Sequence, residues 1–317
     1  MRYGIALPNY GPLASAATLV HLARRAEERG VDSVWVSDHL VAPTGVRSIY
    51  PYDRRPDARP GDMGVIEHFY EPLTTLAYLA GATRRIRLGV SAYVVPYRPA
   101  LVTAKQIASL DALSGGRVIL GAGVGWLQEE FEALGVPFNR RGAISDETLA
   151  IVRRCWTEDV VTHAGRFFTF RDVHTAPRPL RRPPIWIGGG SDAALRRAVR
   201  HGDAWHPIRI KLGPLREALV RLQRIAGGES RPVPALCPRM RLCLTASPMP
   251  ENDRMAGHGT LDQVRRDLEA LAALGARYVL LDTYMDDPEA TRDHEAAWAM
   301  LATLAARALD LTRQTVR

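Results

Sequence analysis

Two glycine-rich turns and one Asp-His pair are the stretches of this chain whose residue types suit chemistry. The first turn, 121–125, reads Gly-Ala-Gly-Val-Gly, and the second, 188–191, reads Gly-Gly-Gly-Ser and opens a helical run. Glycines at a helix start expose unpaired N–H groups at the positive end of the helix dipole, which suits a phosphate. A plain tight turn is the alternative interpretation. Asp38-His39 follows a short apolar run, and a histidine, whose unperturbed pKa is about 6.5, can donate or accept a proton near neutral pH.

The first glycine-rich turn ends a strand–helix–strand unit. Residues 86–95 form a nearly unbroken apolar run rich in β-branched side chains, which predicts a strand buried on both faces. Apolar residues at helical spacing follow over 101–113, and Gly115-Gly116 end that helix because glycine readily adopts a left-handed conformation. A second apolar run, 118–120, leads into the glycines. The pattern therefore indicates two parallel strands joined by a helix.

Short strands and helices alternate along the whole chain. The predicted strands are 3–7, 33–36, 86–95, 118–120, 183–187, 203–206, 240–245 and 278–281. The predicted helices are 15–29, 72–82, 101–113, 128–134, 144–156, 192–199, 215–225, 261–274 and 289–308. This alternation favours an α/β fold, a (β/α)₈ TIM barrel that forms a single domain over 1–317. A doubly wound open sheet is the alternative, but the first strand lacks the glycine fingerprint of such a domain.

Two segments interrupt the alternation. Residues 163–170 show a pattern that predicts a small hairpin. Residues 41–69 are rich in Pro, Gly, Asp and Tyr, and they are too long for an ordinary connection inside a compact domain. We expect this second segment to be an insertion loop at the C-terminal strand ends, where it would act as a lid or substrate wall.

The composition is that of a soluble globular protein, with 46% hydrophobic and 24% charged residues. No apolar run approaches membrane-spanning length, and residues 1–7 predict a strand rather than a signal peptide. Cys155, Cys237 and Cys243 show no metal-ligand spacing and fit a reducing compartment. We therefore expect a cytoplasmic protein with no membrane partner and no metal.

The formal net charge of +8 has two interpretations. It favours attraction to an anionic ligand or nucleic acid, or it reflects a GC-rich coding bias, since Lys105 and Lys211 are the only lysines. Arginines such as Arg24, Arg153 and Arg196 are scattered through predicted helices rather than gathered on one aromatic-laced stripe. We therefore expect no nucleic-acid partner.

The site of a barrel lies at the C-terminal ends of its strands. The residues there include no His or Cys cluster for a metal, no Gly-x-Ser-x-Gly nucleophile elbow and no carboxylate pair for glycoside hydrolysis. They are Asn9, Asp38, His39, Ser91, Ala92, 121–125, Gly188, Gly189, Gly190, Trp205, His206 and Asp282.

Several short blocks spread over almost the whole chain form a family signature. They are EERGVDSVW (27–35), SDH (37–39), EPLTTL (71–76), IRLG (86–89), LSGGR (113–117), GAGVGW (121–126), PPIWIGG (183–189) and GDAW (202–205). In this order they resemble the luciferase-like monooxygenase superfamily of flavin and deazaflavin barrels. That superfamily includes bacterial luciferase and the enzymes that use the 8-hydroxy-5-deazaflavin coenzyme F420. The resemblance is closest to the actinobacterial F420-dependent branch.

The resemblance implies roles for two pairs of residues. Asp38 and His39 would lie beside the reacting edge of the cofactor, where His39 would donate or accept a proton. A purely structural role is the alternative for His39. Ser91-Ala92 would form a bulge that backs the cofactor ring, often through a non-proline cis peptide bond in the deazaflavin enzymes. The implied cofactor is F420, with FMN as the alternative.

The resemblance also assigns the glycines to the cofactor. Gly188, Gly189 and Gly190 would receive its phosphate, and Gly123 and Trp205 are further predicted contacts. F420 also carries an acidic oligoglutamate tail. The arginines that are candidates for binding this tail, or else are solvated surface residues, are Arg140, Arg141, Arg178, Arg181 and Arg182.

Two departures from the F420-dependent sugar-phosphate dehydrogenases bear on the reaction. Those enzymes carry an acidic Glu just after the glycines of the fourth strand and a Trp soon after the Asp-His pair. This chain has an apparent insertion over 123–129, so that no acid falls at the position of that Glu, and it has no Trp over 40–43. We therefore predict an F420H2-dependent reductase that delivers a hydride to a C=C or C=N bond. Such a reaction needs one proton donor, either His39 or a tyrosine of the lid, whose candidate residues are Tyr50, Tyr52, Tyr70 and Glu71.

Two other functions stay open. One is a two-component FMN-dependent monooxygenase, which uses O₂ and a separate cofactor reductase, and the other is a non-catalytic flavin-binding relative. Family habit suggests a homodimer that acts on a small-molecule substrate, in natural-product biosynthesis for example. The sequence does not name the substrate, because lid segments carry specificity and vary freely.

Overall fold

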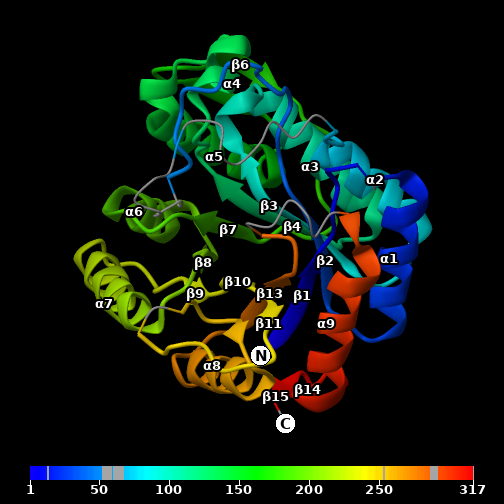
Figure 1. Ribbon diagram of the computed structural model, residues 1–317. Coiled ribbons are helices and arrows are strands. Elements are labelled where there is room, and N and C mark those ends of the chain that lie inside the picture. The colour runs from blue at the N-terminus through cyan, green and yellow to red at the C-terminus, as the bar shows by residue number, and fades with distance from the viewer. Residues whose placement is uncertain (13, 52–58, 60–67, 253, 286–291, 317) are drawn as a thin grey trace.

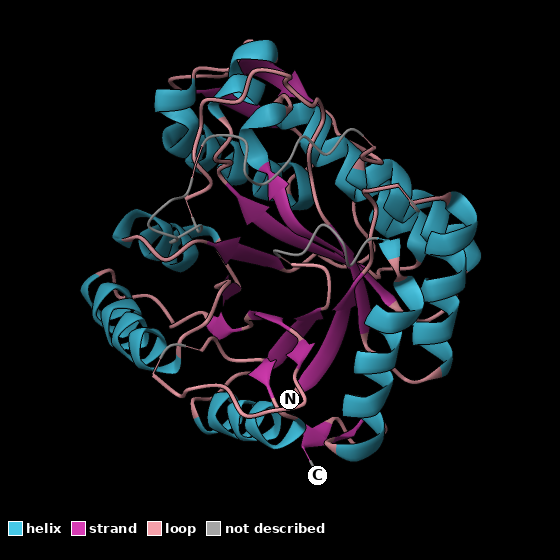
Figure 2. Cartoon of the chain, in the orientation of Figure 1, coloured by secondary structure: helices cyan, strands magenta, loops and turns pink. Residues whose placement is uncertain are grey.

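The computed structural model describes residues 1–12, 14–51, 59, 68–252, 254–285 and 292–316. Strands lie at the centre of the molecule and helices cover the outside (Figure 1), which the colouring by secondary structure in Figure 2 makes clear. Among the described residues, no helix is long and apolar enough to cross a membrane.

The elements alternate as the sequence predicts. The central strands are β1 (Arg2–Ala6), β2 (Ser33–Val36), β3 (Arg87–Val94), β4 (Val118–Gly123), β7 (Ile185–Gly188), β8 (Ala204–His206), β9 (Ala235–Leu236), β10 (Arg239–Arg241) and β13 (Tyr278–Asp282). The long helices are α1 (Ala16–Glu28), α2 (Pro72–Ala82), α3 (Ala100–Ser114), α5 (Arg141–Thr157), α6 (Asp192–His201), α7 (Leu212–Gly228), α8 (Leu261–Ala273) and α9 (His294–Arg307). The smaller elements are η1 (Val95–Tyr97), α4 (Gln128–Ala133), η2 (Phe138–Arg140), β5 (Val161–Ala164), β6 (Thr169–Val173), β11 (Cys243–Leu244), β12 (His258–Gly259), β14 (Leu309–Asp310) and β15 (Thr315–Val316).

One parallel sheet holds all the central strands, in the order β10-β13-β1-β2-β3-β4-β7-β8-β9. The segment 235–241 joins the two edges of this sheet, since β9 pairs with β8 while β10 pairs with β13. The sheet therefore closes on itself, and β9 and β10 share one position of the barrel. The predicted (β/α)₈ barrel is confirmed. The predicted hairpin is also confirmed, because β5 and β6 pair as antiparallel strands.

The strand predicted over 240–245 is wrong in its position. The barrel strand of this region begins earlier, with β9, and β10 ends at Arg241. Beyond it, β11 leaves the barrel and pairs with β12. Pro238 separates β9 from β10, since proline has no N–H to donate to a neighbouring strand. Prolines in this part of the chain interrupt the apolar run, so the sequence pattern did not predict the first half of this strand.

Local sequence explains where several helices begin and end. Thr260 and Gln263 form a capping box at the start of α8, each side chain accepting a hydrogen bond from the other residue's backbone N–H. At the start of α6 the Ser191 hydroxyl accepts a hydrogen bond from the N–H of Ala194. Gly115 ends α3 with φ of 74°, a left-handed conformation that suits glycine. These signals fix the strand-to-helix spacing that the barrel needs.

Trp35 on β2 fills the centre of the barrel. Its side chain is fully buried, and its ring centroid lies 4.9 Å from that of Trp186 and 5.6 Å from that of His206. Gly4 and Gly89, on the strands either side of β2, leave room for the indole, which a Cβ at either position would overlap. A large residue on one strand is thus matched by glycine on its neighbours, as dense core packing requires.

Gly89→Ala is expected to lower the free energy of unfolding by about 1–3 kcal/mol, because the added methyl group overpacks the Trp35 site. Gly81→Ala, in α2, is the matched control. No atom lies within 4 Å of a Cβ at Gly81, and alanine stabilises a helix by roughly 0.5–1 kcal/mol relative to glycine. Urea denaturation measures both variants. Equal midpoints for the two would contradict the packing role of Gly89.

Candidate active site

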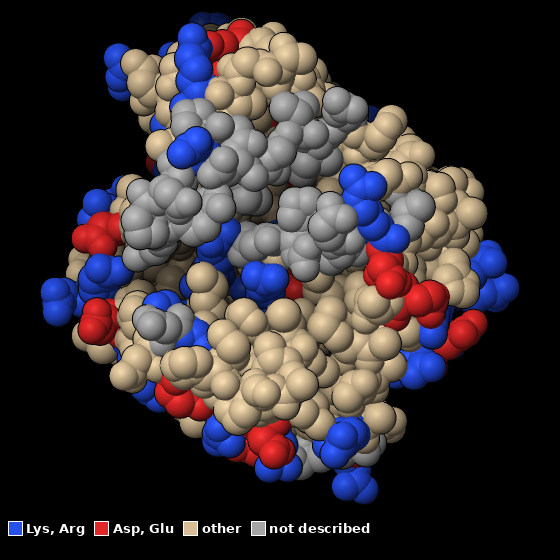
Figure 3. Space-filling view, viewed as in Figure 1, with Lys and Arg blue, Asp and Glu red and all other residues tan. Residues whose placement is uncertain are grey.

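A cavity of about 1140 Å³ lies at the C-terminal ends of the barrel strands. Its walls come from segments that follow β1, β2, β3, β4, β7 and β8, and from the described part of the predicted lid. Lys and Arg side chains are visible in the recess near the middle of the face shown in Figure 3. This is the end of the barrel at which the sequence predicts the site.

The end of β3 carries the predicted bulge. The peptide bond between Ser91 and Ala92 is cis, and the register of β3 against β4 shifts between Val90 and Tyr93. Both the bulge and the cis bond that the resemblance implied are therefore confirmed. Ser91 and Ala92 line the cavity, and Gly123 on β4 lies against them, since a Cβ there would come within 3.1 Å of the Ala92 methyl group.

Two polar side chains, His206 and Arg239, form hydrogen bonds with this bulge. His206 is fully buried, and its Nε2 lies 2.9 Å from the Ser91 hydroxyl while its Nδ1 contacts the carbonyl of Cys237. Because a carbonyl only accepts, Nδ1 carries the ring proton and Nε2 accepts from Ser91. Burial lowers the pKa of His206 to about 4, so the ring is neutral. Arg239 donates to the Ser91 carbonyl and, at 2.7 Å, to Asp282.

Asp38 is held in a buried ion pair. Arg98 donates to both Asp38 oxygens, each at 2.9 Å, and the Val94 N–H donates to Oδ2 at 2.8 Å. Burial raises the pKa of Asp38, and the hydrogen bonds from Arg98 oppose that rise. Arg98 also donates to Glu71 at 2.8 Å. These contacts occupy the carboxylate, so Asp38 ties the end of β2 to the segment after β3.

His39 extends into the cavity next to Asp38 and is held by Glu130 of α4. The His39 Nδ1 lies 2.6 Å from Glu130 Oε2, which also accepts a hydrogen bond of 2.8 Å from the Tyr97 hydroxyl. The Glu130 side chain is fully buried, whereas that of His39 is 26% exposed. Burial raises the pKa of Glu130, but hydrogen bonds from His39, the Leu40 N–H and Tyr97 outweigh it, so the net shift is downward. Glu130 is therefore a carboxylate at neutral pH.

The predicted phosphate cradle forms another part of the cavity wall. Gly188, Gly189 and Gly190 line it and lead into α6. Gly189 has φ of 95°, a left-handed conformation that glycine adopts without strain. Trp205 does not line the cavity; instead its indole N–H donates to the Gly189 carbonyl at 2.7 Å and so fixes the turn from behind.

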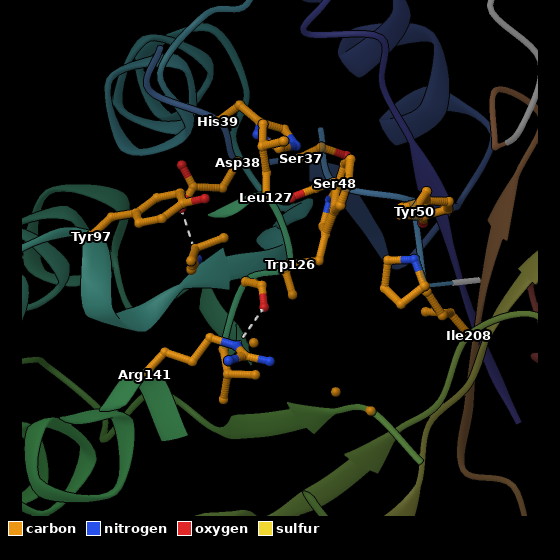
Figure 4. Close-up of a pocket in the computed structure, with 18 of the residues that line it drawn as sticks. Ser37, Asp38, His39, Ser48, Tyr50, Tyr97, Trp126, Leu127, Arg141 and Ile208 are labelled. Atoms are coloured by element: carbon orange, nitrogen blue, oxygen red, sulfur yellow. Dashed lines mark hydrogen bonds between the residues drawn. The ribbon is translucent and has the colours of Figure 1, made fainter. Parts of the chain in front are cut away.

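Arg141 and Arg197 line the same cavity as these glycines. Arg197 is paired with Asp146 at 2.7 Å. Arg141 donates to the carbonyls of Gly125 and Phe138 at 3.3 and 2.9 Å. Within the part of the chain that the structure describes, Arg141 has no carboxylate partner. Figure 4 shows it on a different side of the cavity from His39. The glycine-rich end is thus suited to an anion.

The end of the cavity near His39 is aromatic. Tyr10 and Phe69 stack with their centroids 5.3 Å apart, and the edge of Phe69 meets the His39 ring at the same separation. Trp126 and Tyr50 pack edge to face at 4.9 Å (Figure 4). This part of the wall offers rings and few charges to a ligand.

The four predicted lid residues are placed differently. Tyr50 lines the cavity. Tyr70 is 45% exposed and Glu71 caps the start of α2, and neither lines the cavity. Tyr52 lies outside the described residues.

Sequence reasoning missed Arg98 and Glu130. A signal for Glu130 was present, because the acidic pair at 129–130 starts a predicted helix just after the glycine-rich turn. Among the described residues, no group of three or more His, Cys, Asp or Glu side chains is arranged to hold a metal ion.

Comparison with known proteins adds a family. A family model described as luciferase-like monooxygenase matches residues 1–254. An uncharacterized protein of Mycobacterium tuberculosis is 38% identical over 186 residues, which are 59% of this chain and 63% of that protein. The F420-dependent glucose-6-phosphate dehydrogenase of Kineococcus radiotolerans is 32% identical over 192 residues, which are 59% of this chain and 51% of that protein. The matched part is thus less than two thirds of the length of these relatives.

One similar solved structure is named as a monooxygenase rather than as an F420-dependent enzyme. The monooxygenase RslO1 from Streptomyces bottropensis has a TM-score of 0.72 and 22% sequence identity, and the match covers 95% of this chain and 97% of that one. At this identity the similarity shows the fold alone. A solved structure of an F420-dependent secondary alcohol dehydrogenase is also similar, with a TM-score of 0.68 and 15% sequence identity over 95% of this chain and 98% of that one. One fold thus appears in a protein named for F420 and in a protein named for oxygen chemistry.

The buried neutral His206 is expected to make the protein less stable in mild acid. An unfolded histidine takes up a proton near pH 6.5, whereas the pKa of His206 in the fold is lowered to about 4. The stability from His206 is therefore complete above about pH 6.5 and is lost as the pH falls toward about 4, by roughly 1.4 kcal/mol per pH unit. Between about pH 7 and about pH 5, His206 should lower the free energy of unfolding of the wild type by about 2 kcal/mol. In His206→Gln this part of the decline should be absent.

Urea denaturation at the two pH values measures this decline. The matched control is His21→Gln on the exposed side of α1, which should keep the decline of the wild type. A decline that is the same in His206→Gln as in the wild type would show that His206 is not a buried neutral group.

Proposed function

The chain belongs to the luciferase-like monooxygenase family, and from this premise we propose that it is an F420-dependent reductase. In this proposal the enzyme delivers a hydride from F420H2 to a C=C or C=N bond of a small-molecule or natural-product substrate. The observation that carries the proposal is a single cavity that joins the Ser91–Ala92 bulge, a cationic glycine-rich end and the His39 side chain.

The residues of the cavity fit a cofactor with a phosphate and an acidic tail. Backbone N–H groups at the start of α6 suit a phosphate, and Ser191 already caps one of them. Arg141, which has no carboxylate partner among the described residues, suits a carboxylate of the oligoglutamate tail. FMN has a phosphate but no such tail, so the arginine favours F420. The relative from Kineococcus radiotolerans, which is named as F420-dependent, supports the same choice.

Each group of residues then has a defined task. When bound, F420H2 supplies the hydride. Ser91 and Ala92 back its ring, and the glycines and Arg141 bind its charged end. His39 donates the proton that completes the two-electron reduction, because it is a titratable side chain that is partly exposed at the aromatic end. Tyr50 is the second candidate for this proton.

The aromatic wall indicates what kind of substrate this site would take. Phe69, Trp126 and Tyr50 present rings, and the carboxylates nearest to them are already bonded to His39 or Arg98. We propose that the substrate is uncharged and unsaturated at the end that enters the cavity. As further parts of the proposal, the enzyme is a cytoplasmic homodimer and depends on a separate enzyme to reduce its cofactor.

A fluorescence titration of the purified protein with F420 and, in parallel, with FMN tests the cofactor. We expect F420 to bind more tightly. A preference for FMN, with oxygen consumption when a flavin reductase is added, would overturn the proposal in favour of a two-component monooxygenase. Binding of neither cofactor would favour the non-catalytic relative.

Arg141→Gln is expected to weaken F420 binding about tenfold, the equivalent of about 1.4 kcal/mol, because one charge-assisted hydrogen bond is lost. The matched control is Arg140→Gln, since Arg140 is exposed and does not line the cavity. FMN binding, which involves no acidic tail, should change little in both variants. Equal F420 affinities for the two variants would remove Arg141 from the cofactor site.

A further inference from the structure

We propose that Glu130 is a positioning residue for proton transfer, which holds His39 as the Nδ1-protonated imidazole so that Nε2 exchanges the proton with the substrate. The proposal rests on the proposed function in one respect, namely that His39 is the proton donor. The assignment of the imidazole tautomer depends on neither cofactor nor substrate.

The first support is the chemistry of the Glu130 contact. A carboxylate has no proton to give, so the nitrogen 2.6 Å from Glu130 Oε2 must be the one that carries hydrogen. Tyr97 donates to the same oxygen at 2.8 Å, and burial raises the pKa of the Tyr97 phenol, which therefore keeps its proton. The Nδ1 proton of His39 is thus fixed in both charge states of the ring.

The second support is the position of the other ring nitrogen. The His39 ring lines the cavity, and its centroid lies 5.3 Å from Phe69 and 6.5 Å from Trp126, both edge-on. Among the described residues, none forms a hydrogen bond with Nε2. Because the ring lines the cavity, this nitrogen is left for a ligand.

The third support is that Glu130 holds the chain beyond His39 as well. Its Oε1 accepts hydrogen bonds from the N–H groups of Leu40 at 2.6 Å and Val41 at 3.2 Å. One buried carboxylate thus fixes both the imidazole and Leu40 and Val41, which begin the segment of the cavity wall formed by residues 40–48. The Oε1 contacts hold the Glu130 carboxylate in place as the partner of the ring, and turning the ring over would break its own contact with Oε2.

The neighbouring Glu129 shows what a purely structural carboxylate does here. Its Oε1 accepts hydrogen bonds from the N–H groups of Arg47 at 2.8 Å and Ser48 at 3.0 Å, farther along the same wall. Glu129 is buried like Glu130 but does not contact His39. It is therefore the matched control for Glu130: the same residue type on the same helix, with the same kind of backbone contact.

Other charges near the pair are already neutralised. Asp38 and Arg98 form their own paired hydrogen bonds beside Tyr97. Phe69 and Trp126 are neutral. Glu130 is therefore the charged group that decides which nitrogen of His39 holds the proton.

Nuclear magnetic resonance of the cofactor-free protein tests this directly. Two-bond ¹H–¹⁵N correlations of ¹⁵N-histidine-labelled protein distinguish protonated from unprotonated ring nitrogens, and His39→Asn identifies the His39 signals among the 9 histidines. At alkaline pH we expect the wild type and Glu129→Gln to show Nδ1 protonated and Nε2 unprotonated. In Glu130→Gln the amide can donate as well as accept, so both tautomers should appear. The wild-type tautomer pattern in Glu130→Gln would overturn the proposal.

A double-mutant cycle tests the consequence for catalysis. The probe reaction is anaerobic reduction of cyclohex-2-en-1-one by F420H2, followed by the absorbance of the oxidised cofactor in a single turnover. His39→Asn and Glu130→Gln should each slow this step by about 10²-fold or more, with little change in F420 affinity. The double variant should be no slower than His39→Asn, because Glu130 acts through His39. Multiplicative losses would show an independent effect and overturn the positioning role.

The two experiments separate the two proposals. If no variant and no wild type reduces the enone, the proposed function loses support while the resonance result still decides the role of Glu130. If the wild type turns over and Glu130→Gln keeps both its rate and its tautomer, Glu130 is a structural residue like Glu129.

Discussion

The buried ion pair between Asp38 and Arg98 is the interaction on which the rest of the site depends. It joins the end of β2 to the segment after β3, and through Glu71 it reaches the start of α2. Removing two charges from water is costly, and the cost is offset here because both carboxylate oxygens and both terminal guanidinium nitrogens (Nη1 and Nη2) are hydrogen-bonded. The pair thereby ties the strand end that carries His39 to the strand that carries the Ser91–Ala92 bulge.

Much of this arrangement follows from local sequence. Strand ends, glycine turns and helix caps are set by neighbouring residues, so Asp38, His39, the Ser91–Ala92 bulge and the triple glycine could be placed from the sequence alone. Glu130 and Arg98 could not be paired in the same way, because they meet their partners across 91 and 60 positions of sequence. Such contacts exist only once the barrel has closed.

Two assignments show how finely a strand or segment must be placed. Trp205 and His206 are adjacent on β8, and side chains of adjacent strand residues point to opposite faces. His206 therefore lines the cavity while Trp205 lies behind the glycine turn. Tyr70 and Glu71 follow the irregular segment directly and so look like part of the lid. In the structure Glu71 is the N-cap of α2, since its carboxylate accepts the N–H of Thr74 at 2.6 Å.

The way α4 holds the cavity wall has a consequence for how this protein can change over time. Glu129 and Glu130 bind the backbone N–H groups of Leu40, Val41, Arg47 and Ser48. Almost any residue type supplies such an N–H. The wall can therefore exchange its side chains, and with them the shape offered to a substrate, while its path and the His39 ring stay in place. Substrate range and proton transfer can therefore evolve independently. Point substitutions along residues 40–48 can change substrate specificity without moving His39.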